Sequence, residues 1–364
     1  MRVIMTGGGT GGHIYPALAI ADKIKEVHRD ADILFVGTER GLESTLVPEN
    51  GYPIEFINVR GFDRKHLLKN VKVVAELLKG SIQAKNIIKR FKPDLVIGTG
   101  GYVCGPVVRA AAKLGVRCFI HEQNAFPGVT NKMLEPMVEK VFLGFPEAGK
   151  HFKHPEKHVT TGNPVRKAFF QVDKSKARLA LGVPMDSFMV LSFGGSRGAE
   201  KINEIMTSVA ESLQGVEGTE LFFATGSVHY DSIIKKMGER GFKPGGNIHI
   251  MKYIDRMQDY LGAADLVISR SGALTVSEIT VCGKACFLIP SPYVTGNHQY
   301  FNAKSVADKG GAVILQEKDI TPDGVLDLIA KMKKNPELLA TMEEGSRRAA
   351  PENACEIIYR ELMI

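Results

Sequence analysis

The chain has 364 residues, of which 44% are hydrophobic and 24% are charged. These proportions are ordinary for a globular protein, so they exclude a disordered tail, a collagenous chain and a disulfide-rich miniprotein. The net charge of +7 is too small to indicate a nucleic-acid partner, although it favours anionic phosphates or an anionic lipid surface. At roughly 150 residues per domain, the length predicts about two domains.

Cysteine usage and apolar runs indicate the compartment. Five cysteines are scattered along the chain, which favours reduced, buried thiols over a disulfide framework. No run approaches the roughly 18 apolar residues that a membrane-spanning helix needs. The first residues, MRVIMTGGGT, lack the apolar core of a signal peptide. We therefore expect a soluble cytoplasmic protein whose contact with a membrane is peripheral.

Short β-branched runs alternate with amphipathic stretches of helical period, for example 17–27 and 201–213. Many of the runs are continuously apolar, which is typical of parallel strands covered on both faces. The alternation indicates βαβ units and a doubly wound α/β fold. In chain order, the expected strands are 2–6, 32–37, 54–58, 94–98, 117–121, 140–143, 188–193, 221–225, 247–251, 265–269, 285–290 and 312–315.

The two series of strands resemble each other. The first strand ends in G-G-G-T-G-G-H at 7–13, and a later strand ends in G-G-S-R-G-A at 194–199. D-L-V-I-G at 94–98 returns as D-L-V-I-S at 265–269. We therefore expect two similar domains, 1–162 and 163–345, joined at a turn-rich stretch. The C-terminal helix, at about 346–364, is expected to pack back on the first domain.

The glycine-rich loops come between a strand and a helix, where backbone amides and the helix start favour an anion. Residues 7–12 match G-x-G-x-x-G, the pattern of dinucleotide sites. Such a site also needs an acidic residue about 20 positions further on, and Glu39 lies 27 residues after Gly12. A tight turn without a ligand is the other interpretation. The loops 194–196 and 270–273 suit a diphosphate, with Arg270 as an added charge or as a structural residue.

Two polar groups follow strands of the first half. His13 lies just after the glycine loop, where it is either a general base or a helix cap. His121, Glu122, Gln123 and Asn124 follow a strand directly. Their position predicts a site, although turn and cap hydrogen bonds are an alternative explanation.

In the second half, Glu278 lies on the helix that follows the 270–273 loop. A carboxylate there is able to accept both hydroxyls of a ribose, because it is a double acceptor. Gln299 and Asn302 are three residues apart and share a helix face, which suits a sugar. Each of the three also fits an ordinary exposed helix surface. No metal motif is present, because the His and Cys spacings do not fit zinc, and we expect no cofactor.

The segment 60–92 mixes basic and apolar residues. An apolar stripe beside cationic residues is able to lie on an anionic bilayer. The alternative is a helix whose apolar stripe faces the sheet, and Val74, Leu77 and Leu78 are expected to do so. The basic residues are Arg60, Arg64, Lys65, Lys69, Lys72 and Lys79.

Taken together, the motifs resemble in order the signatures of the MurG family of bacterial N-acetylglucosaminyltransferases. They are G-G-T-G-G-H at 8–13, G-G-Y at 100–102, H-E-Q-N at 121–124, T-G-N-P-V-R at 161–166, G-G-S at 194–196 and R-S-G-A-L-T-V-S-E at 270–278. The resemblance covers essentially the whole chain. It implies the GT-B fold, in which two Rossmann-like domains face each other across a cleft.

The resemblance also implies an activity. UDP-GlcNAc would donate GlcNAc to the C4 hydroxyl of MurNAc in lipid I, an undecaprenyl-diphospho-MurNAc-pentapeptide, giving lipid II with a β-1,4 bond. The protein would lie on the cytoplasmic face of the cell membrane, against an anionic lipid surface and beside cell-wall assembly proteins.

The same resemblance implies roles for individual residues. Ile254 would read uracil, Glu278 would hold the ribose, Ser196 and the Ser271 loop would contact the diphosphate, and Gln299 and Asn302 would contact GlcNAc. The donor loop continues through Ala273, Leu274, Thr275, Val276 and Ser277. Thr10, Gly11, Gly12 and Asn124 would close on donor and acceptor, with Arg166 near the junction. His13 is the expected general base, and Glu122 is the alternative.

The chain departs from the family pattern at two positions. Arg197 and His298 stand where the family commonly has Gln. Alternative functions are another GT-B enzyme acting on a UDP-sugar, such as a UDP-GlcNAc 2-epimerase or a diglucosyl-lipid synthase, or a non-catalytic sugar-nucleotide-binding protein. A dehydrogenase is a weaker alternative.

Overall fold

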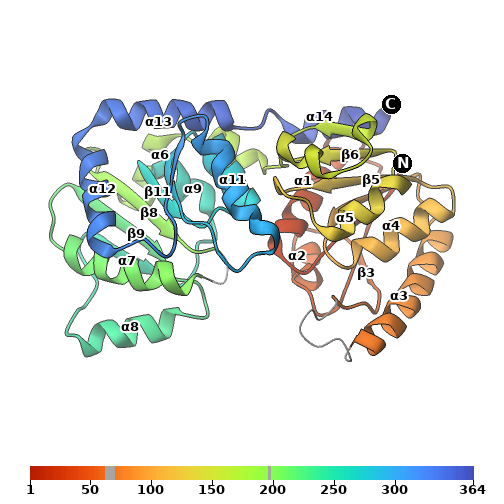
Figure 1. Ribbon diagram of the computed structural model, residues 1–364, viewed down its shortest axis with the longest axis horizontal. Helices are drawn as coiled ribbons and strands as arrows, with labels where there is room; N and C mark the ends of the chain where they lie inside the picture. Colours follow the sequence, from red (N-terminus) through yellow and green to blue (C-terminus); the bar gives the residue numbers. More distant parts are fainter. Residues whose placement is uncertain (62–69, 196–197) are drawn as a thin grey trace. The chain divides into compact units, whose positions relative to one another are not determined.

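The computed structural model describes residues 1–61, 70–195 and 198–364. The chain forms two compact units. Unit 1 comprises Met1–Val165 and Pro351–Ile364, and unit 2 comprises Arg166–Ala350 (Figure 1). The residues of the sequence analysis that lie outside the described ranges are Arg64, Lys65, Lys69, Ser196 and Arg197.

Unit 1 contains a parallel seven-stranded sheet with the order β3-β2-β1-β4-β5-β6-β7. Because β1 pairs with both β2 and β4, the strand order reverses beside β1, which is where α/β sheets bind ligands. The strands are β1 Arg2–Gly7, β2 Asp32–Gly37, β3 Ile54–Phe56, β4 Leu95–Gly100, β5 Arg117–Glu122, β6 Lys140–Leu143 and β7 His158–Thr160. The helices are α1 Gly11–Val27, α2 Glu43–Glu49, α3 Asn70–Phe91, α4 Cys104–Lys113, α5 Val129–Leu134 and α14 Ala354–Met363, with 3₁₀ turns at Glu135–Met137, Pro146–His151 and Pro155–Lys157.

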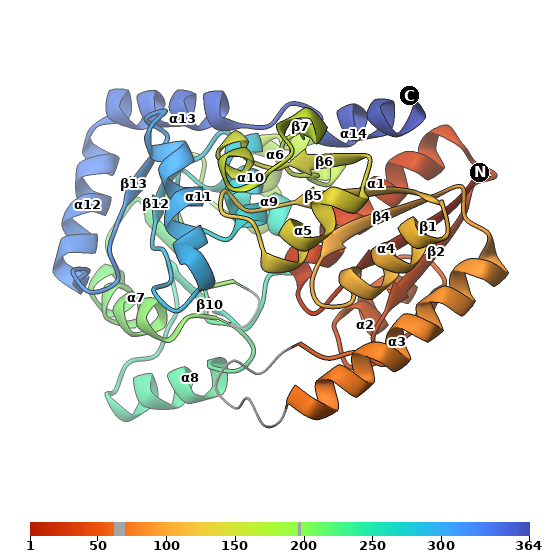
Figure 2. The same ribbon diagram turned by 45° about the vertical axis from the view of Figure 1, so that its right-hand side comes forward.

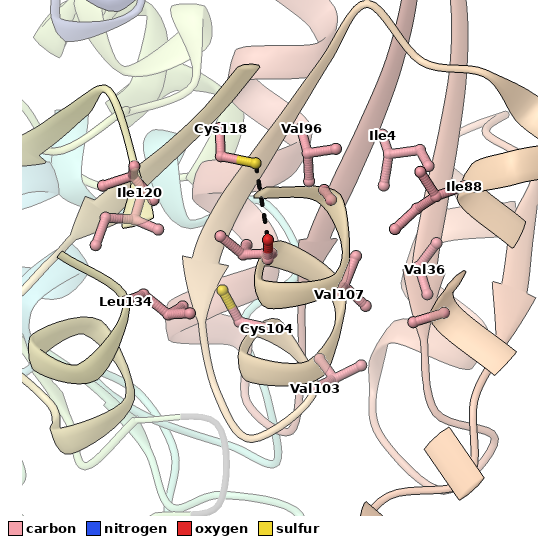
Figure 3. Close-up of a cluster of buried hydrophobic side chains, with 14 of the residues drawn as sticks. Ile4, Val36, Ile88, Val96, Val103, Cys104, Val107, Cys118, Ile120 and Leu134 are labelled. Carbon is pink, nitrogen blue, oxygen red and sulfur yellow. Dashed lines mark hydrogen bonds between the residues drawn. The ribbon is translucent and has the colours of Figure 1, made fainter. Parts of the chain in front are cut away.

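The strands of unit 1 are buried on both faces, because successive side chains point to opposite sides of a strand. Val3 and Met5 pack with α1 and α14 on one face. Ile4 packs with α3 and α4 on the other face, where Figure 2 shows these helices beside the strands. Figure 3 shows Cys104 and Cys118 among the apolar side chains of this second core, with Cys118 Sγ donating to the Val108 carbonyl at 3.7 Å.

Unit 2 repeats this architecture with a parallel six-stranded sheet of order β10-β9-β8-β11-β12-β13. Here β8 pairs with β9 and β11, so the strand order reverses beside β8. The strands are β8 Phe188–Phe193, β9 Thr219–Ala224, β10 Ile248–Met251, β11 Leu266–Ser269, β12 Ala285–Leu288 and β13 Ala312–Ile314. The helices are α6 Lys174–Leu181, α7 Glu200–Leu213, α8 Tyr230–Glu239, α9 Met257–Ala263, α10 Ala273–Val281, α11 His298–Ala307, α12 Pro322–Lys334 and α13 Pro336–Ala349, with 3₁₀ turns at Lys167–Gln171 and Thr295–Asn297.

The prediction of two doubly wound parallel sheets is confirmed. One short edge strand, β7, was not predicted, because its three residues are only partly buried and give no apolar run. The C-terminal helix begins at Ala354 rather than near residue 346. Pro351 ends the preceding helix, because a residue before proline avoids the helical region and Ala350 is extended, with ψ 139°. Asn353 then caps the start of α14, where its side chain accepts from the Glu356 amide at 3.3 Å.

The orientation of one apolar residue on α3 also differs from the prediction. Leu77 packs against the core of unit 1 as expected. Leu78 does not face the sheet, since it is 64% exposed. The helix advances about 100° per residue, so neighbouring residues in sequence reach different faces. The side chain of Val74 lies outside the described part of the structure.

Candidate functional site

The glycine loop of unit 1, residues 7–12, lies at the carboxyl end of β1. The Gly8 amide donates to the Gly100 carbonyl at 3.3 Å. A Cβ on Gly101 would lie 2.4 Å from the Gly8 carbonyl oxygen, so the two loops require glycine at this contact. α1 begins at Gly11, and the first amides of a helix have no acceptor within the helix. Thr10 and Gly12 are exposed beside them, which makes this turn suited to an anion.

His13 is held at the first turn of α1 by three groups. Its Nδ1 lies 3.0 Å from the Gly8 carbonyl and 3.4 Å from the Thr10 hydroxyl. A carbonyl oxygen only accepts, so this contact assigns the proton of the neutral ring to Nδ1. Nε2 is then the atom with a lone pair, and it faces Gly100, where an added Cβ would come within 3.1 Å. The Thr99 hydroxyl also donates to the His13 carbonyl, at 2.7 Å. A general base requires a fixed ring with a free lone pair, and here Nε2 carries that lone pair.

Glu122 is 2% exposed at the end of β5, and both of its carboxylate oxygens accept hydrogen bonds. The Asn124 amide donates to Oε1 at 3.0 Å, and the Asn124 side chain does so at 3.3 Å. The Gly128 amide donates to Oε2 at 3.0 Å and the Asn131 side chain at 2.8 Å. A carboxylate with four donors organises the loop after β5, and this geometry favours His13 over Glu122 as the base.

The neighbouring residues of the H-E-Q-N motif are also engaged within unit 1. His121 is fully buried, with Nε2 3.1 Å from the Gly162 carbonyl and Nδ1 2.9 Å from the Gln123 side-chain nitrogen. Burial lowers the pKa of His121 to about 4, against a smaller opposing effect of the Gly162 hydrogen bond. His121 is therefore neutral at physiological pH and joins β5 to the 162 turn.

Sequence reasoning missed Glu43, the first residue of α2. This carboxylate is 1% exposed and accepts from the Gly9 amide at 2.9 Å. It also accepts from the Thr38 amide at 3.0 Å and the Thr38 hydroxyl at 2.7 Å. The available signal is the pair Gly37 and Gly41, because a Cβ at either position would collide with the Glu43 side chain.

In unit 2, α10 presents only some of its proposed ligand contacts to solvent. Leu274, Thr275 and Glu278 are partly exposed, and Glu278 lies beside each of the other two because it is four residues from Leu274 and three from Thr275. The Ser277 hydroxyl donates to the Ala273 carbonyl at 3.0 Å. The buried members of the set are Ile254, Ser271, Ala273, Val276 and Ser277.

The Glu278 carboxyl has an unusual titration. Burial raises its pKa from 4.5 to about 7, and the nearby charge of Arg166 opposes this effect. Arg166 itself is exposed and lies over the Phe169 ring, 5.2 Å from its centroid. An acid whose ionisation is costly in the free protein gains most from a ligand that donates hydrogen bonds to it.

Beside α10, a cavity of about 570 Å³ lies at the carboxyl ends of β8 and β11. Gly194, Arg270 and Gln299 line it. Arg270 pairs with Glu317 and donates to the Ile289 carbonyl at 3.2 Å, so its charge is largely neutralised. Gln299 Oε1 accepts from the Ser291 amide at 2.9 Å.

Ser271 and Asn302 lie behind this cavity rather than at its surface, since both are fully buried. The Asn302 side chain donates to the Ser271 carbonyl at 3.1 Å, so it holds the loop before α10. The Ser271 hydroxyl is buried without a hydrogen-bond partner within the described residues.

Among the described residues, no three His, Cys, Asp or Glu side chains gather as metal ligands do. In the same part of the chain, no helix has both the length and the apolarity needed to cross a bilayer.

Two family models match the chain. Residues 3–143 match the glycosyltransferase family 28 N-terminal domain. Residues 189–356 match the glycosyltransferase family 28 C-terminal domain.

Curated relatives match along the full length. A protein of Acetivibrio thermocellus named UDP-N-acetylglucosamine--N-acetylmuramyl-(pentapeptide) pyrophosphoryl-undecaprenol N-acetylglucosamine transferase is 47% identical, over 99% of this chain and 96% of its own. A Bacillus cytotoxicus protein of the same name is 46% identical over 99% of this chain and 98% of its own. Among solved structures, Acinetobacter baumannii MurG superimposes with a TM-score of 0.76 at 30% identity, covering 100% of this chain and 99% of its own.

Proposed function

The chain belongs to glycosyltransferase family 28, and on this premise we propose that it transfers GlcNAc from UDP-GlcNAc to lipid I. The acceptor is the C4 hydroxyl of MurNAc in undecaprenyl-diphospho-MurNAc-pentapeptide, and the products are lipid II and UDP. The observation that carries this proposal is 47% identity, over 99% of the chain, to a relative named for that transfer. An N-acetylglucosaminyltransferase of peptidoglycan synthesis is therefore the activity that we assign.

Unit 2 binds the donor in this proposal. Ile254 lies near the uracil, and Glu278 accepts the two ribose hydroxyls. The amides at the start of α10, with the Ser271 loop and Ser196, contact the diphosphate, because a helix start stabilises negative charge. Gln299 contacts GlcNAc from the cavity beside Arg270, and Asn302 holds the Ser271 loop behind it.

Unit 1 binds the acceptor and supplies the base. His13 Nε2 removes the proton of the acceptor hydroxyl while that oxygen forms a bond to the anomeric carbon of GlcNAc. The bond from this carbon to the diphosphate oxygen breaks, so that an α-linked donor gives a β-1,4 product and UDP leaves with the electron pair. Thr10, Gly11, Gly12 and Asn124 position the reactants, and Arg166 near the junction adds positive charge.

The membrane contact that we propose is the outer face of α3. Leu78 and Ile82 are 64% and 62% exposed, and their i, i+4 spacing puts them side by side. Lys79, Lys85 and Lys89 are exposed on the same helix. An apolar pair among cations fits an anionic bilayer, where the lipid of the acceptor is anchored. This arrangement supports a peripheral position on the cytoplasmic face of the membrane.

Incubating the purified protein with labelled UDP-GlcNAc and a lipid I analogue tests the transfer. We expect label in the lipid fraction and one UDP released for each sugar transferred. Epimerised sugar without an acceptor would instead indicate a 2-epimerase, and binding without UDP release would indicate a non-catalytic protein. Either result contradicts the proposal.

Flotation with vesicles containing anionic lipid tests the membrane contact. Replacing Leu78 and Ile82 with Ser should reduce vesicle binding by at least about 10-fold, because each apolar side chain contributes on the order of 1.5 kcal/mol when it is buried. The matched control is Leu179→Ser in unit 2, at a side chain that is 84% exposed. Equal losses in both variants would exclude α3 as the contact.

A further inference from the structure

Glu43 and His13 bind opposite ends of one peptide group. The amide of the Gly8–Gly9 peptide bond donates to Glu43 Oε2 at 2.9 Å. The carbonyl of the same bond accepts from His13 Nδ1 at 3.0 Å. In a trans peptide the N–H and C=O point in opposite directions, so one planar unit joins the two side chains.

A charge at one end of a peptide group changes the electron density at its other end. A negative charge at the N–H end draws that proton outward and increases the electron density on the carbonyl oxygen, because the amide is delocalised. A richer carbonyl oxygen forms a stronger hydrogen bond with Nδ1–H, above all when the ring is protonated and carries positive charge. Through this peptide group, a charge on Glu43 would act on the hydrogen bond of His13 Nδ1 without touching the ring.

We propose that Glu43 is a positioning residue that orients and strengthens the base His13 through the Gly8–Gly9 peptide group. The arrangement has the logic of a carboxylate–histidine pair with a peptide bond inserted between its members. The inference rests on the proposed function, in which His13 takes the proton of the acceptor hydroxyl.

The environment of Glu43 leaves its charge available for this task. Three neutral groups donate to it, namely two amides and the Thr38 hydroxyl. The Tyr102 hydroxyl lies 3.3 Å from that of Thr38 and extends the network by one neutral group. Glu39 and Arg40, in the loop before α2, are exposed to solvent, where water screens them.

Charged groups on the elements around α1 lie far along the helix from His13. α14 contributes Glu356, which pairs with Lys23 at 2.7 Å, and Tyr359, which meets His28 at 2.8 Å. Lys23 is ten residues beyond His13, about 15 Å along the axis at 1.5 Å per residue. β4 and its loop present Thr99 and glycines, and His121 of β5 is neutral.

The two conservative variants of Glu43 separate charge from packing. Glu43→Gln keeps the shape, removes the charge and turns an amide N–H₂ toward N–H donors. Glu43→Asp keeps the charge and shortens the side chain. If Glu43 only fills space, Gln is the milder change, whereas our proposal makes Asp the milder one.

The first experiment measures kcat/KM for GlcNAc transfer against pH. In Glu43→Gln we expect activity to fall about 10-fold, and the midpoint of the acid limb to move about 0.5–1 pH unit lower. Glu43→Asp should keep the midpoint of the unmodified protein, and so should Glu49→Gln, the exposed control on the same helix. A midpoint in Glu43→Gln that matches the unmodified protein would overturn the proposal.

The second experiment needs neither a variant of Glu43 nor activity. Two-bond ¹H–¹⁵N correlation spectra report which ring nitrogen of a neutral histidine carries the proton. The His13 signals are assigned as those missing from His13→Ala. We expect the Nδ1–H form, and the Nε2–H form would overturn the link to Gly8. Because the spectrum does not depend on transfer, it tests the pair even if the protein fails to act on lipid I.

Discussion

The acidic side chains near the carboxyl edges of the two sheets differ in their surroundings. In unit 1, Glu43 and Glu122 are almost fully buried, and neutral donors satisfy both oxygens of each. In unit 2, Glu278 has its pKa raised to about 7 by burial. The Ser271 hydroxyl is buried without a partner within the described residues.

The difference separates two tasks. Satisfied carboxylates hold backbone in one geometry, which is what the positioning of a base requires. Polar groups that lack hydrogen-bond partners, or whose ionisation is unfavourable, gain stabilisation when a ligand completes their hydrogen bonds. We therefore expect substitutions in unit 1 to affect chemistry and folding, and substitutions in unit 2 to affect donor affinity.

The largest expected effect is at His13. His13→Ala should lower kcat by about 10²–10⁴-fold, the usual contribution of a general base. UDP affinity should stay unchanged, because we place the donor on unit 2. His154→Ala, at a partly exposed histidine that lies near Glu156, is the control. A kcat within a factor of two of the unmodified protein would remove His13 from the mechanism.

Glu278→Ala tests the proposed donor site of unit 2. The donor KM should rise by about 10–100-fold with a smaller change in kcat, because hydrogen bonds to a charged group contribute on the order of 1.5–3 kcal/mol. Steady-state kinetics at saturating acceptor separates the two parameters. An unchanged donor KM would show that the ribose lies elsewhere.

The raised pKa of Glu278 predicts a pH dependence of donor binding. Ribose hydroxyls donate to the ionised carboxylate, so binding below pH 7 must first release a proton. Affinity for UDP-GlcNAc should therefore be constant above about pH 8 and fall up to about 10-fold from pH 7 to pH 6. Calorimetry in buffers of different ionisation enthalpy measures the released proton, and Glu278→Gln should abolish both effects. An identical pH profile in that variant would contradict the assignment.

Glu122→Gln should have the smallest effect on the reaction and a clear effect on folding. The amide would turn a donor toward groups that already donate, so we expect a loss of about 1–3 kcal/mol in the free energy of unfolding. Denaturant unfolding measures it. The pH profile of the surviving activity should keep its acid limb, whereas a lost acid limb would make Glu122 the base instead.

Much of the fold was predictable, because continuous apolar runs mark buried parallel strands. The strands 32–37, 140–143 and 188–193 match their predicted bounds. The apolar helical period at 17–27 covers only the later part of α1, because the first turn of this helix is built from glycine-rich sequence without apolar spacing. Leu78 was placed on the wrong face, because one residue along a helix is a turn of about 100°.

The site was predictable in part. Gly-rich loops and strand ends mark where ligands bind, which brought attention to His13 and Glu278. The sequence signal for Glu43 is weak, since a glutamate at the start of a helix is usually an exposed residue and only the nearby pair Gly37 and Gly41 points to its burial. Its burial follows from a local contact with Thr38 and from a contact with the Gly9 amide, 34 residues away, and the second contact is one that local sequence does not encode.

The interruption between α13 and α14 at Pro351 has a consequence for folding during synthesis on the ribosome. The seven strands of unit 1 emerge first, yet α14, whose Ile358 and Leu362 complete one of its cores, is made only after all of unit 2. In nascent unit 1 the apolar surface that α14 covers therefore stays exposed while the 185 residues of unit 2 are synthesised, at roughly 5–20 residues per second. Unit 2 is one unbroken stretch and has no such delay, so it is the part that is able to finish folding before its neighbour.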